Sequence, residues 1–440
     1  MYSSVKRLFI IASLLVSVIF MSEAQTGTWS GRLDAQGTQL SIVFHLDGEK
    51  PTIDSPDQGA KGIPVQVERG AAGKITIRIP ALAATFEGQW IINMIVGTFS
   101  QMNVSFPLTL TPGEKKPDRP QTPTGPFPYA TEEVSFNNGD IQLEGTLVLP
   151  DGYSRKTPVL LMVTGSGQQD RNEELFDHKP FAVIADAFAR AGIATLRYDD
   201  RGFKNYDGNI YDCTTEDFKN DALAGISMLR ERFDKVGVIG HSEGGTIAMM
   251  LAAEKKADFI ISLAGMVISG AETLIWQNRI ALEGLGFSDE ETDTYCRMLE
   301  NAFNATVQGG RMPDPDIYDV PEALKRNYQA VAAQIQLPYM RHFLSLDMRP
   351  LLEQITCPVM ALNGSKDKQV NHETNLDALR SGLTPDSRSR IEAAEGLNHL
   401  FQHCMTGEVT EYREIEETIS PEILETLVQW LTDTIGNNKT

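Results

Sequence analysis

The sequence has few cysteines, and they do not form a recognisable site. The four are Cys213, Cys296, Cys357 and Cys404. None belongs to a C-x-x-C pair, and no group of Cys and His has the spacing of a zinc site. This pattern predicts no metal site. Two interpretations of the thiols stay open, a disulfide in an exported chain or buried free thiols.

The sequence also lacks an excess of positive charge. It contains 39 Lys and Arg against 59 Asp and Glu, which gives a formal net charge of −20. This balance disfavours nucleic acid as a partner. The acidic residues are spread along the chain and do not form a tail, so solubility is the simplest explanation for them.

A hydrophobic run of membrane-spanning length is missing as well. The apolar run Leu8–Met21 is shorter than the about 20 residues that a spanning helix requires. Lys6 and Arg7 precede it, and small residues up to Ala24 suit a signal peptidase. We therefore expect a cleaved signal peptide over residues 1–24, export to the periplasm or beyond, and no integral membrane span after cleavage. The alternative is an uncleaved N-terminal anchor.

The chain has 440 residues, and since domains usually contain about 100–200 residues, this length predicts two domains. Over residues 25–112, apolar side chains recur at every second position, as at Leu40, Ile42 and Phe44. This period is typical of half-buried strands and predicts a small antiparallel β domain. Residues 113–130 are rich in proline and predict an extended linker.

The pattern changes over residues 131–440, where apolar strand patterns alternate with helical ones. The strand pattern at 158–164 is followed by a helical pattern at 181–190 and another strand at 193–198. Such alternation predicts an α/β fold with a mostly parallel sheet and helices on both faces. Residues 271–346 instead show several successive helical patterns. An insertion at this point lies over the carboxyl ends of the strands, so we expect a helical cap over the active site.

One motif in this region carries chemistry. Gly240–Gly244 reads G-x-S-x-G with Ser242 at its centre, after the strand pattern of Val236–Gly240 and before the helical pattern of Thr246–Glu254. Strand, sharp turn and helix are the context of a nucleophile elbow. A serine hydroxyl is a weak nucleophile, so it requires a base and an orienting acid elsewhere in the chain.

Two later residues fit these roles. Asp367 lies in a turn just beyond a strand, and His399 lies on the loop after the last strand. In proteins with this type of nucleophile elbow the catalytic residues follow one another along the chain as serine, acid and histidine. Ser242, Asp367 and His399 have this order. His399 would take the serine proton, and Asp367 would hold its ring in the correct tautomer. His403 is the alternative base, and His241 is expected to point away from the serine side chain.

Acyl chemistry also requires hydrogen-bond donors for the oxyanion. The backbone N–H of Glu243, directly after the nucleophile, is the first candidate. The second is the backbone N–H of Ser166, in the loop Thr164–Arg171 that follows an earlier buried strand. Gly167 is the alternative to Ser166.

With these residues in hand, the chain resembles the α/β-hydrolase family. Within the family it is similar to the branch of secreted bacterial esterases classed with serine aminopeptidase-like hydrolases. The resemblance implies hydrolysis of carboxylic esters under a helical cap. The motifs that carry it are Gly165–Arg171, Tyr198–Gly202, the elbow around Ser242, Gly364–Asp367 and Asn398–His399.

The sequence therefore predicts a secreted serine hydrolase that cleaves small-molecule carboxylic esters through an acyl-enzyme on Ser242, without a metal or an organic cofactor. A peptidase that releases N-terminal residues is the first alternative, and it requires an acidic site that holds a free amine. A binding protein with an inactive hydrolase fold is the second. The intact set of Ser242, Asp367 and His399 argues against this last reading.

Overall fold

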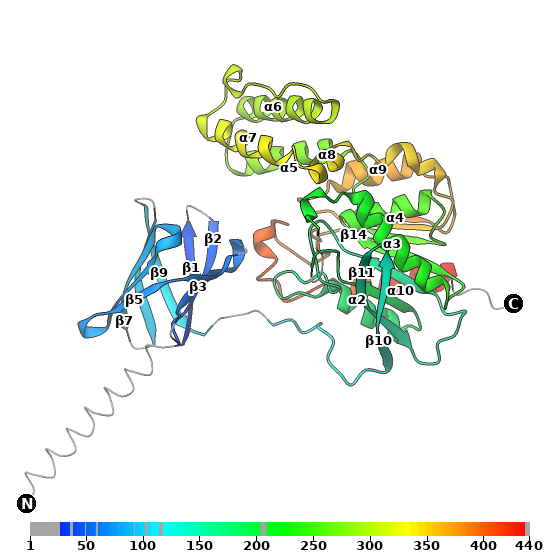
Figure 1. Ribbon diagram of the computed structural model, residues 1–440, viewed down its shortest axis with the longest axis horizontal. Helices are drawn as coiled ribbons and strands as arrows, with labels where there is room; N and C mark the ends of the chain where they lie inside the picture. The colour runs from blue at the N-terminus through cyan, green and yellow to red at the C-terminus, as the bar shows by residue number, and fades with distance from the viewer. Residues whose placement is uncertain are drawn as a thin grey trace, which may run out of the picture. The chain divides into compact units, whose positions relative to one another are not determined.

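The computed structural model describes residues 27–435, apart from 36–37, 49, 59, 92, 102–103, 114–117 and 204–207. The expected signal peptide, residues 1–24, lies outside this part of the chain. The chain divides into two compact units, Met1–Asp118 and Arg119–Thr440 (Figure 1). None of the helices in the described residues combines the length and the apolar character that a membrane span needs.

The first unit is an antiparallel β domain, as the alternating pattern predicts. Its nine strands follow the order β4-β3-β2-β1-β9-β8-β7-β6-β5. Every second side chain is buried, as at Ile75, Ile77 and Ile79 in β6, because successive residues of a strand point to opposite faces. The strands are β1 Thr28–Ala35, β2 Thr38–His45, β3 Thr52–Ser55, β4 Ala60–Pro64, β5 Gln66–Arg69, β6 Lys74–Ile79, β7 Ala84–Ile91, β8 Met94–Gln101 and β9 Val104–Pro112.

The second unit is built on an eight-stranded sheet with the order β10-β11-β13-β12-β14-β15-β16-β17. The sheet is mixed. β10 and β11 form a hairpin, β11 pairs antiparallel with β13, and the pairs from β13 to β17 are parallel. The strands are β10 Tyr129–Asn138, β11 Ile141–Pro150, β12 Val159–Val163, β13 Ala194–Tyr198, β14 Val236–His241, β15 Ile260–Leu263, β16 Val359–Gly364 and β17 Arg390–Ala394.

Helices cover both faces of this sheet. Strand β12 is buried on both sides and sends Leu161 into one apolar cluster and Leu160 into the other. The first cluster is completed by α3 Thr215–Arg230, α4 Glu243–Ala253 and α9 His372–Gly382. The second is completed by α2 Pro180–Arg190 and α10 Pro421–Ile435. A sheet buried on both faces explains why its central strands are continuously apolar in sequence.

Four helices between β15 and β16 form a separate layer, which we call the cap (Figure 1). They are α5 Gly270–Gly284, α6 Asp289–Gln308, α7 Glu322–Gln334 and α8 Pro338–Ser345. The cap has an apolar cluster of its own, which includes Tyr295, Phe303 and Tyr328. Most of its aromatic side chains are therefore used in internal packing.

The segment after the unit boundary is bound to the second unit. The Arg119 guanidinium donates to the carbonyl oxygens of Phe176, Arg413 and Ile415. The Gln121 side chain donates to the carbonyl of Ile419 and accepts from its N–H. These contacts fix residues that the sequence predicts to be part of a linker.

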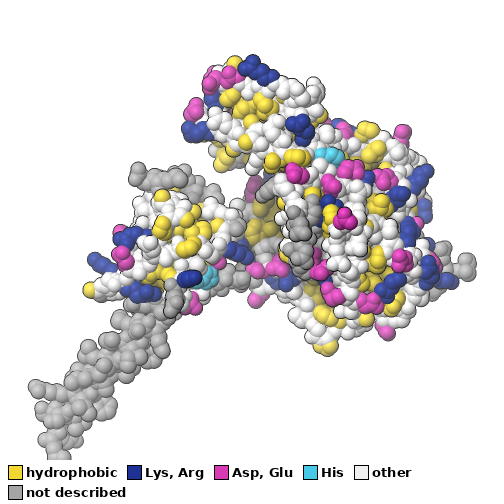
Figure 2. Space-filling model, in the orientation of Figure 1, with side chains coloured by type: hydrophobic (Ala, Val, Ile, Leu, Met, Phe, Trp, Pro, Cys, Tyr) yellow, Lys and Arg dark blue, Asp and Glu magenta, His cyan; other side chains and the backbone are white. Residues whose placement is uncertain are grey.

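The structure pairs none of the four cysteines in a disulfide, and Cys213 and Cys296 are buried. On the face visible in Figure 2, acidic and basic side chains are interspersed. A mixed surface of this kind fits the spread of charge along the sequence.

Candidate active site

Ser242 stands at a sharp turn between β14 and α4. Its φ of 53° and ψ of −120° are unusual for a residue with a side chain, and such strain is found mainly at functional sites. A Cβ on Gly240 would lie 1.9 Å from the carbonyl oxygen of Gly244, and one on Gly244 would lie 2.0 Å from that of Val163. Only glycine fits at these two positions, because strand and helix backbones approach so closely.

Asp367 and His399 meet beside this turn. His399 Nδ1 lies 2.7 Å from Asp367 Oδ2, and both side chains are almost fully buried. Asp367 Oδ1 accepts hydrogen bonds from the backbone N–H groups of Gln369, at 2.7 Å, and Val370, at 2.9 Å. The carboxylate therefore accepts from Nδ1–H and leaves Nε2 of His399 as a proton acceptor.

The structure brings the predicted base and nucleophile to the same place. Ser242 and His399 both line one pocket of about 550 Å³, as do Ser166 and Glu243. His403 does not line this pocket; its ring is largely exposed and pairs with Glu417 at 2.9 Å. The geometry thus favours His399 over His403 as the base.

The loop after β12 passes directly beside the nucleophile. A Cβ on Gly165 would lie 3.2 Å from that of Ser242, and the N–H of Gly165 donates to Glu173 at 2.8 Å. Ser166 and Gly167 follow, and Gly167 has a φ of 102°, which favours glycine. Since the N–H of Gly165 has a partner, the N–H groups of Ser166 and Gly167 are the loop's candidates for an oxyanion.

The segment that follows β13 forms hydrogen bonds and an ion pair with the Thr164–Arg171 loop. The Thr164 hydroxyl donates to Asp200 at 2.7 Å, and the Gln169 N–H donates to the same carboxyl at 3.0 Å. Burial raises the pKa of Asp200 well above its ordinary value. Arg171 binds Asp199 at 2.8 Å. Asp199 and Asp200 of the motif Tyr198–Gly202 therefore hold the Thr164–Arg171 loop in place.

The side chain of Glu243 connects the elbow to the cap, a contact that the sequence did not indicate. Its buried carboxylate accepts from the Thr215 hydroxyl at 2.6 Å and from the Tyr339 hydroxyl of α8 at 2.7 Å. Burial, and then the charge of Glu243, raise the pKa of Tyr339, so its phenol keeps its proton and can donate. The cap is thereby bonded to the residue that follows the nucleophile.

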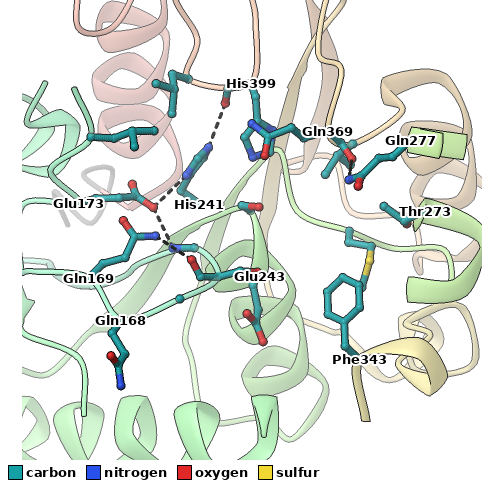
Figure 3. Close-up of a pocket in the computed structure, with 18 of the residues that line it drawn as sticks. Gln168, Gln169, Glu173, His241, Glu243, Thr273, Gln277, Phe343, Gln369 and His399 are labelled. Atoms are coloured by element: carbon teal, nitrogen blue, oxygen red, sulfur yellow. Dashed lines mark hydrogen bonds and ion pairs between the residues drawn. The ribbon is translucent and has the colours of Figure 1, made fainter. Parts of the chain in front are cut away.

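His241 also has partners that the sequence did not indicate. Figure 3 shows its ring between the carboxylate of Glu173 and the backbone carbonyl of His399. The signal that could have drawn attention to it is its place directly before Ser242.

The rest of the pocket is apolar and amide-rich. Leu274, Met340 and Phe343 of the cap line it together with four glutamines, and Gln277 of the cap donates to the carbonyl of Gln369 at 2.6 Å. No Lys or Arg is among the described residues of this lining. Within the described part of the chain, no group of three or more His, Cys, Asp or Glu side chains could hold a metal ion.

Comparisons with known proteins find similar hydrolases. Residues 138–386 match the model of a family described as X-Pro dipeptidyl-peptidase (S15 family). The chain is 26% identical over 280 residues to Esterase EstD of Thermotoga maritima. It is 24% identical over 206 residues to the mitochondrial palmitoyl-protein thioesterase ABHD10 of Mus musculus.

These matches cover only part of each relative. The match to EstD spans 62% of this chain and 62% of the relative, and the match to ABHD10 spans 47% and 59%. Among solved structures, Est1E from Butyrivibrio proteoclasticus is 17% identical with a TM-score of 0.41, over 69% of this chain and 99% of that one.

Proposed function

The chain belongs to the family described as X-Pro dipeptidyl-peptidase (S15 family), a group of α/β-hydrolases, and from this premise we propose that it is a serine hydrolase that cleaves carboxylic esters. The observation that carries the proposal is the buried His399–Asp367 pair at 2.7 Å, whose His399 lines the pocket together with Ser242. Export, as residues 1–24 suggest, is part of the same proposal.

The reaction follows from the tautomer of His399, in which Nδ1–H donates to Asp367 and Nε2 can accept a proton. Ser242 Oγ attacks the ester carbonyl carbon while His399 Nε2 takes its proton. The carbonyl oxygen becomes an oxyanion, held by the N–H groups of Glu243 and Ser166. When the oxyanion collapses, the bond to the alcohol oxygen breaks and His399 returns the proton to the leaving group. Water, deprotonated by His399, then releases the acid from Ser242 in the same manner.

The pocket carboxylates support an ester over a peptide with a free amine. Three glutamates line the described pocket, and each has a partner within the protein. Glu173 accepts from Gly165 and contacts His241, Glu243 accepts from two hydroxyls, and Glu174 pairs with Lys179. A substrate ammonium would therefore have to share a carboxylate that already has a partner. The family's description keeps a peptidase as the second candidate.

The test is labelling with a fluorophosphonate followed by a substrate panel. We expect the wild type to be labelled and Ser242→Ala not to be labelled. Ser227→Ala is the matched control and should be labelled normally. Ser227 is exposed on α3, and its hydroxyl donates to the carbonyl of Leu223 in the same helix. Absence of labelling in the wild type would overturn the hydrolase proposal and support a binding protein.

The panel then separates the two hydrolase candidates. We expect p-nitrophenyl esters to be cleaved much faster than aminoacyl and X-Pro p-nitroanilides. Turnover of the anilides above that of the esters would favour the peptidase.

A further inference from the structure

A second buried acid–histidine pair lies beside the proposed triad, and the reaction above does not use it. Glu173 is 3% exposed and His241 is 7% exposed. Glu173 follows the oxyanion loop and has a φ of 54°, while His241 is the last residue of β14. Burying two such groups is unfavourable unless their hydrogen bonds are nearly complete, so their partners indicate what the pair does.

Both ring nitrogens of His241 face hydrogen-bond acceptors (Figure 3). Nδ1 lies 2.9 Å from Glu173 Oε1, and Nε2 lies 2.9 Å from the carbonyl oxygen of His399. A carbonyl oxygen can only accept, and Glu173 Oε1 also accepts from the N–H of Gly165. A neutral imidazole has one N–H, so two acceptors are best satisfied by an imidazolium next to a carboxylate.

The surroundings of the ring support this charge state. Burial lowers the pKa of His241, but the charge and hydrogen bond of Glu173, the His399 carbonyl and the charge of Asp367 together outweigh it, and the pKa lies above its ordinary value. His178 is a contrast within the same unit, because its Nε2 also contacts a carbonyl oxygen at 2.9 Å. Its Nδ1 contacts the Thr418 hydroxyl at 3.0 Å where His241 contacts a carboxylate, and burial lowers the pKa of His178 to about 4.

The charged or titratable groups that act on His241 are few. Glu173 faces it from the loop before α2, His399 from the loop after β17, and Asp367 acts on it through its charge. The side chains packed around the pair from α2, β15 and the His399 loop are apolar: Pro180, Phe181, Ile184, Leu263, Leu400 and Phe401.

We propose that Glu173 and a positively charged His241 form a positioning pair that ties the oxyanion loop to the His399 loop and places a positive charge beside the His399 ring. The proposal rests on the proposed function, since it assigns the pair to the same site. The tie follows from the contacts, because Glu173 holds Gly165 and His241 holds the His399 backbone. The charge of His241 acts directly on the His399 ring, because the two ring centroids lie 4.7 Å apart and a positive charge at this distance disfavours a second one.

The decisive variant is Glu173→Gln, which removes the charge and can keep the two hydrogen bonds that Oε1 accepts. Gly165 N–H and His241 Nδ1 both contact Oε1, so the amide oxygen in its place accepts from both of them. A neutral His241 then carries its proton on Nδ1 and loses the hydrogen bond from Nε2 to the His399 carbonyl. We expect the acid limb of kcat/KM for p-nitrophenyl acetate to move upward by about one pH unit. His241→Gln should move it in the same direction and also lower kcat, because the tie is then broken on one side.

A matched pair of controls lies close by in the sequence. His403 and Glu417 also form a histidine–glutamate pair, but the His403 ring is 58% exposed and does not line the pocket. His403→Gln and Glu417→Gln should leave the acid limb in place. A purely structural role for Glu173 would lower activity at every pH without moving the limb, and that result would overturn the proposal.

Protonation is measured separately by NMR on the full chain labelled with ¹⁵N-histidine. We expect two ring N–H groups for His241 in the wild type and one in Glu173→Gln. A single N–H in the wild type would overturn the proposal even if a variant failed to fold. Fluorophosphonate labelling of Ser242 keeps the two proposals apart, since the NMR result does not depend on turnover.

Discussion

Asp367→Asn is the substitution for which the structure dictates the outcome most closely. Asp367 Oδ1 accepts from two backbone N–H groups, those of Gln369 and Val370. An asparagine must keep its single oxygen on these donors, since turning its N–H₂ toward them would leave two buried N–H groups without acceptors. The N–H₂ therefore takes the place of Oδ2 and points at His399 Nδ1.

This orientation forces the wrong tautomer of His399. Nδ1 becomes the acceptor, the ring proton moves to Nε2, and Nε2 can no longer take the proton of Ser242. We expect kcat to fall by about 10⁴-fold, which corresponds to about 5.4 kcal/mol of transition-state stabilisation. The melting temperature should change little, because the buried hydrogen bonds are retained.

The assay is steady-state hydrolysis of a p-nitrophenyl ester, with thermal unfolding of each variant in parallel. Asp377→Asn is the matched control, because Asp377 lies on α9 with its side chain 72% exposed and should keep wild-type kcat. A folded Asp367→Asn variant within tenfold of the wild type would refute the assignment of Asp367 as the orienting acid.

Three further outcomes are expected. Gly240→Ala should lose about 3 kcal/mol or more in urea unfolding, since its Cβ meets backbone, whereas Gly284→Ala in α5 meets nothing within 4 Å and should gain about 0.5–1 kcal/mol. Tyr339→Phe leaves a buried carboxylate with one donor fewer, so thermal unfolding should show a loss of about 1–3 kcal/mol, with a lower kcat/KM. A fragment that begins at Arg119 should label with fluorophosphonate like the full chain, and one that begins at residue 131 should melt at a lower temperature because it lacks the Arg119 and Gln121 contacts.

The positions of Ser242, Asp367 and His399 could be predicted because each follows the end of a strand. Carboxyl ends of parallel strands share one edge of a sheet, so chain order and strand pattern together bring such residues close. The antiparallel β domain was predictable for a similar reason, since a period of two reports burial directly. The mixed character of the larger sheet was harder to predict, because pairing direction depends on connections between strands and not on the strand pattern itself.

The contacts of Glu173, His241 and Tyr339 could not be predicted in this way. Glu173 lies in an irregular loop and is 68 positions from its partner His241, and Tyr339 is 96 positions from Glu243. No period relates residues of a loop or a cap to a distant side chain. Their pairing is decided by side-chain direction within the folded molecule.

The hydrogen bond between Tyr339 and Glu243 has a consequence for how such enzymes diversify. A cap inserted between two strands looks like a module that can be exchanged to change the substrate. Here the cap provides one of two hydroxyls that satisfy a buried carboxylate next to the nucleophile. A chimera with a foreign cap would leave that carboxylate without one of its two hydrogen-bond donors unless position 243 were replaced together with the cap. The cap and the elbow are therefore constrained to change together.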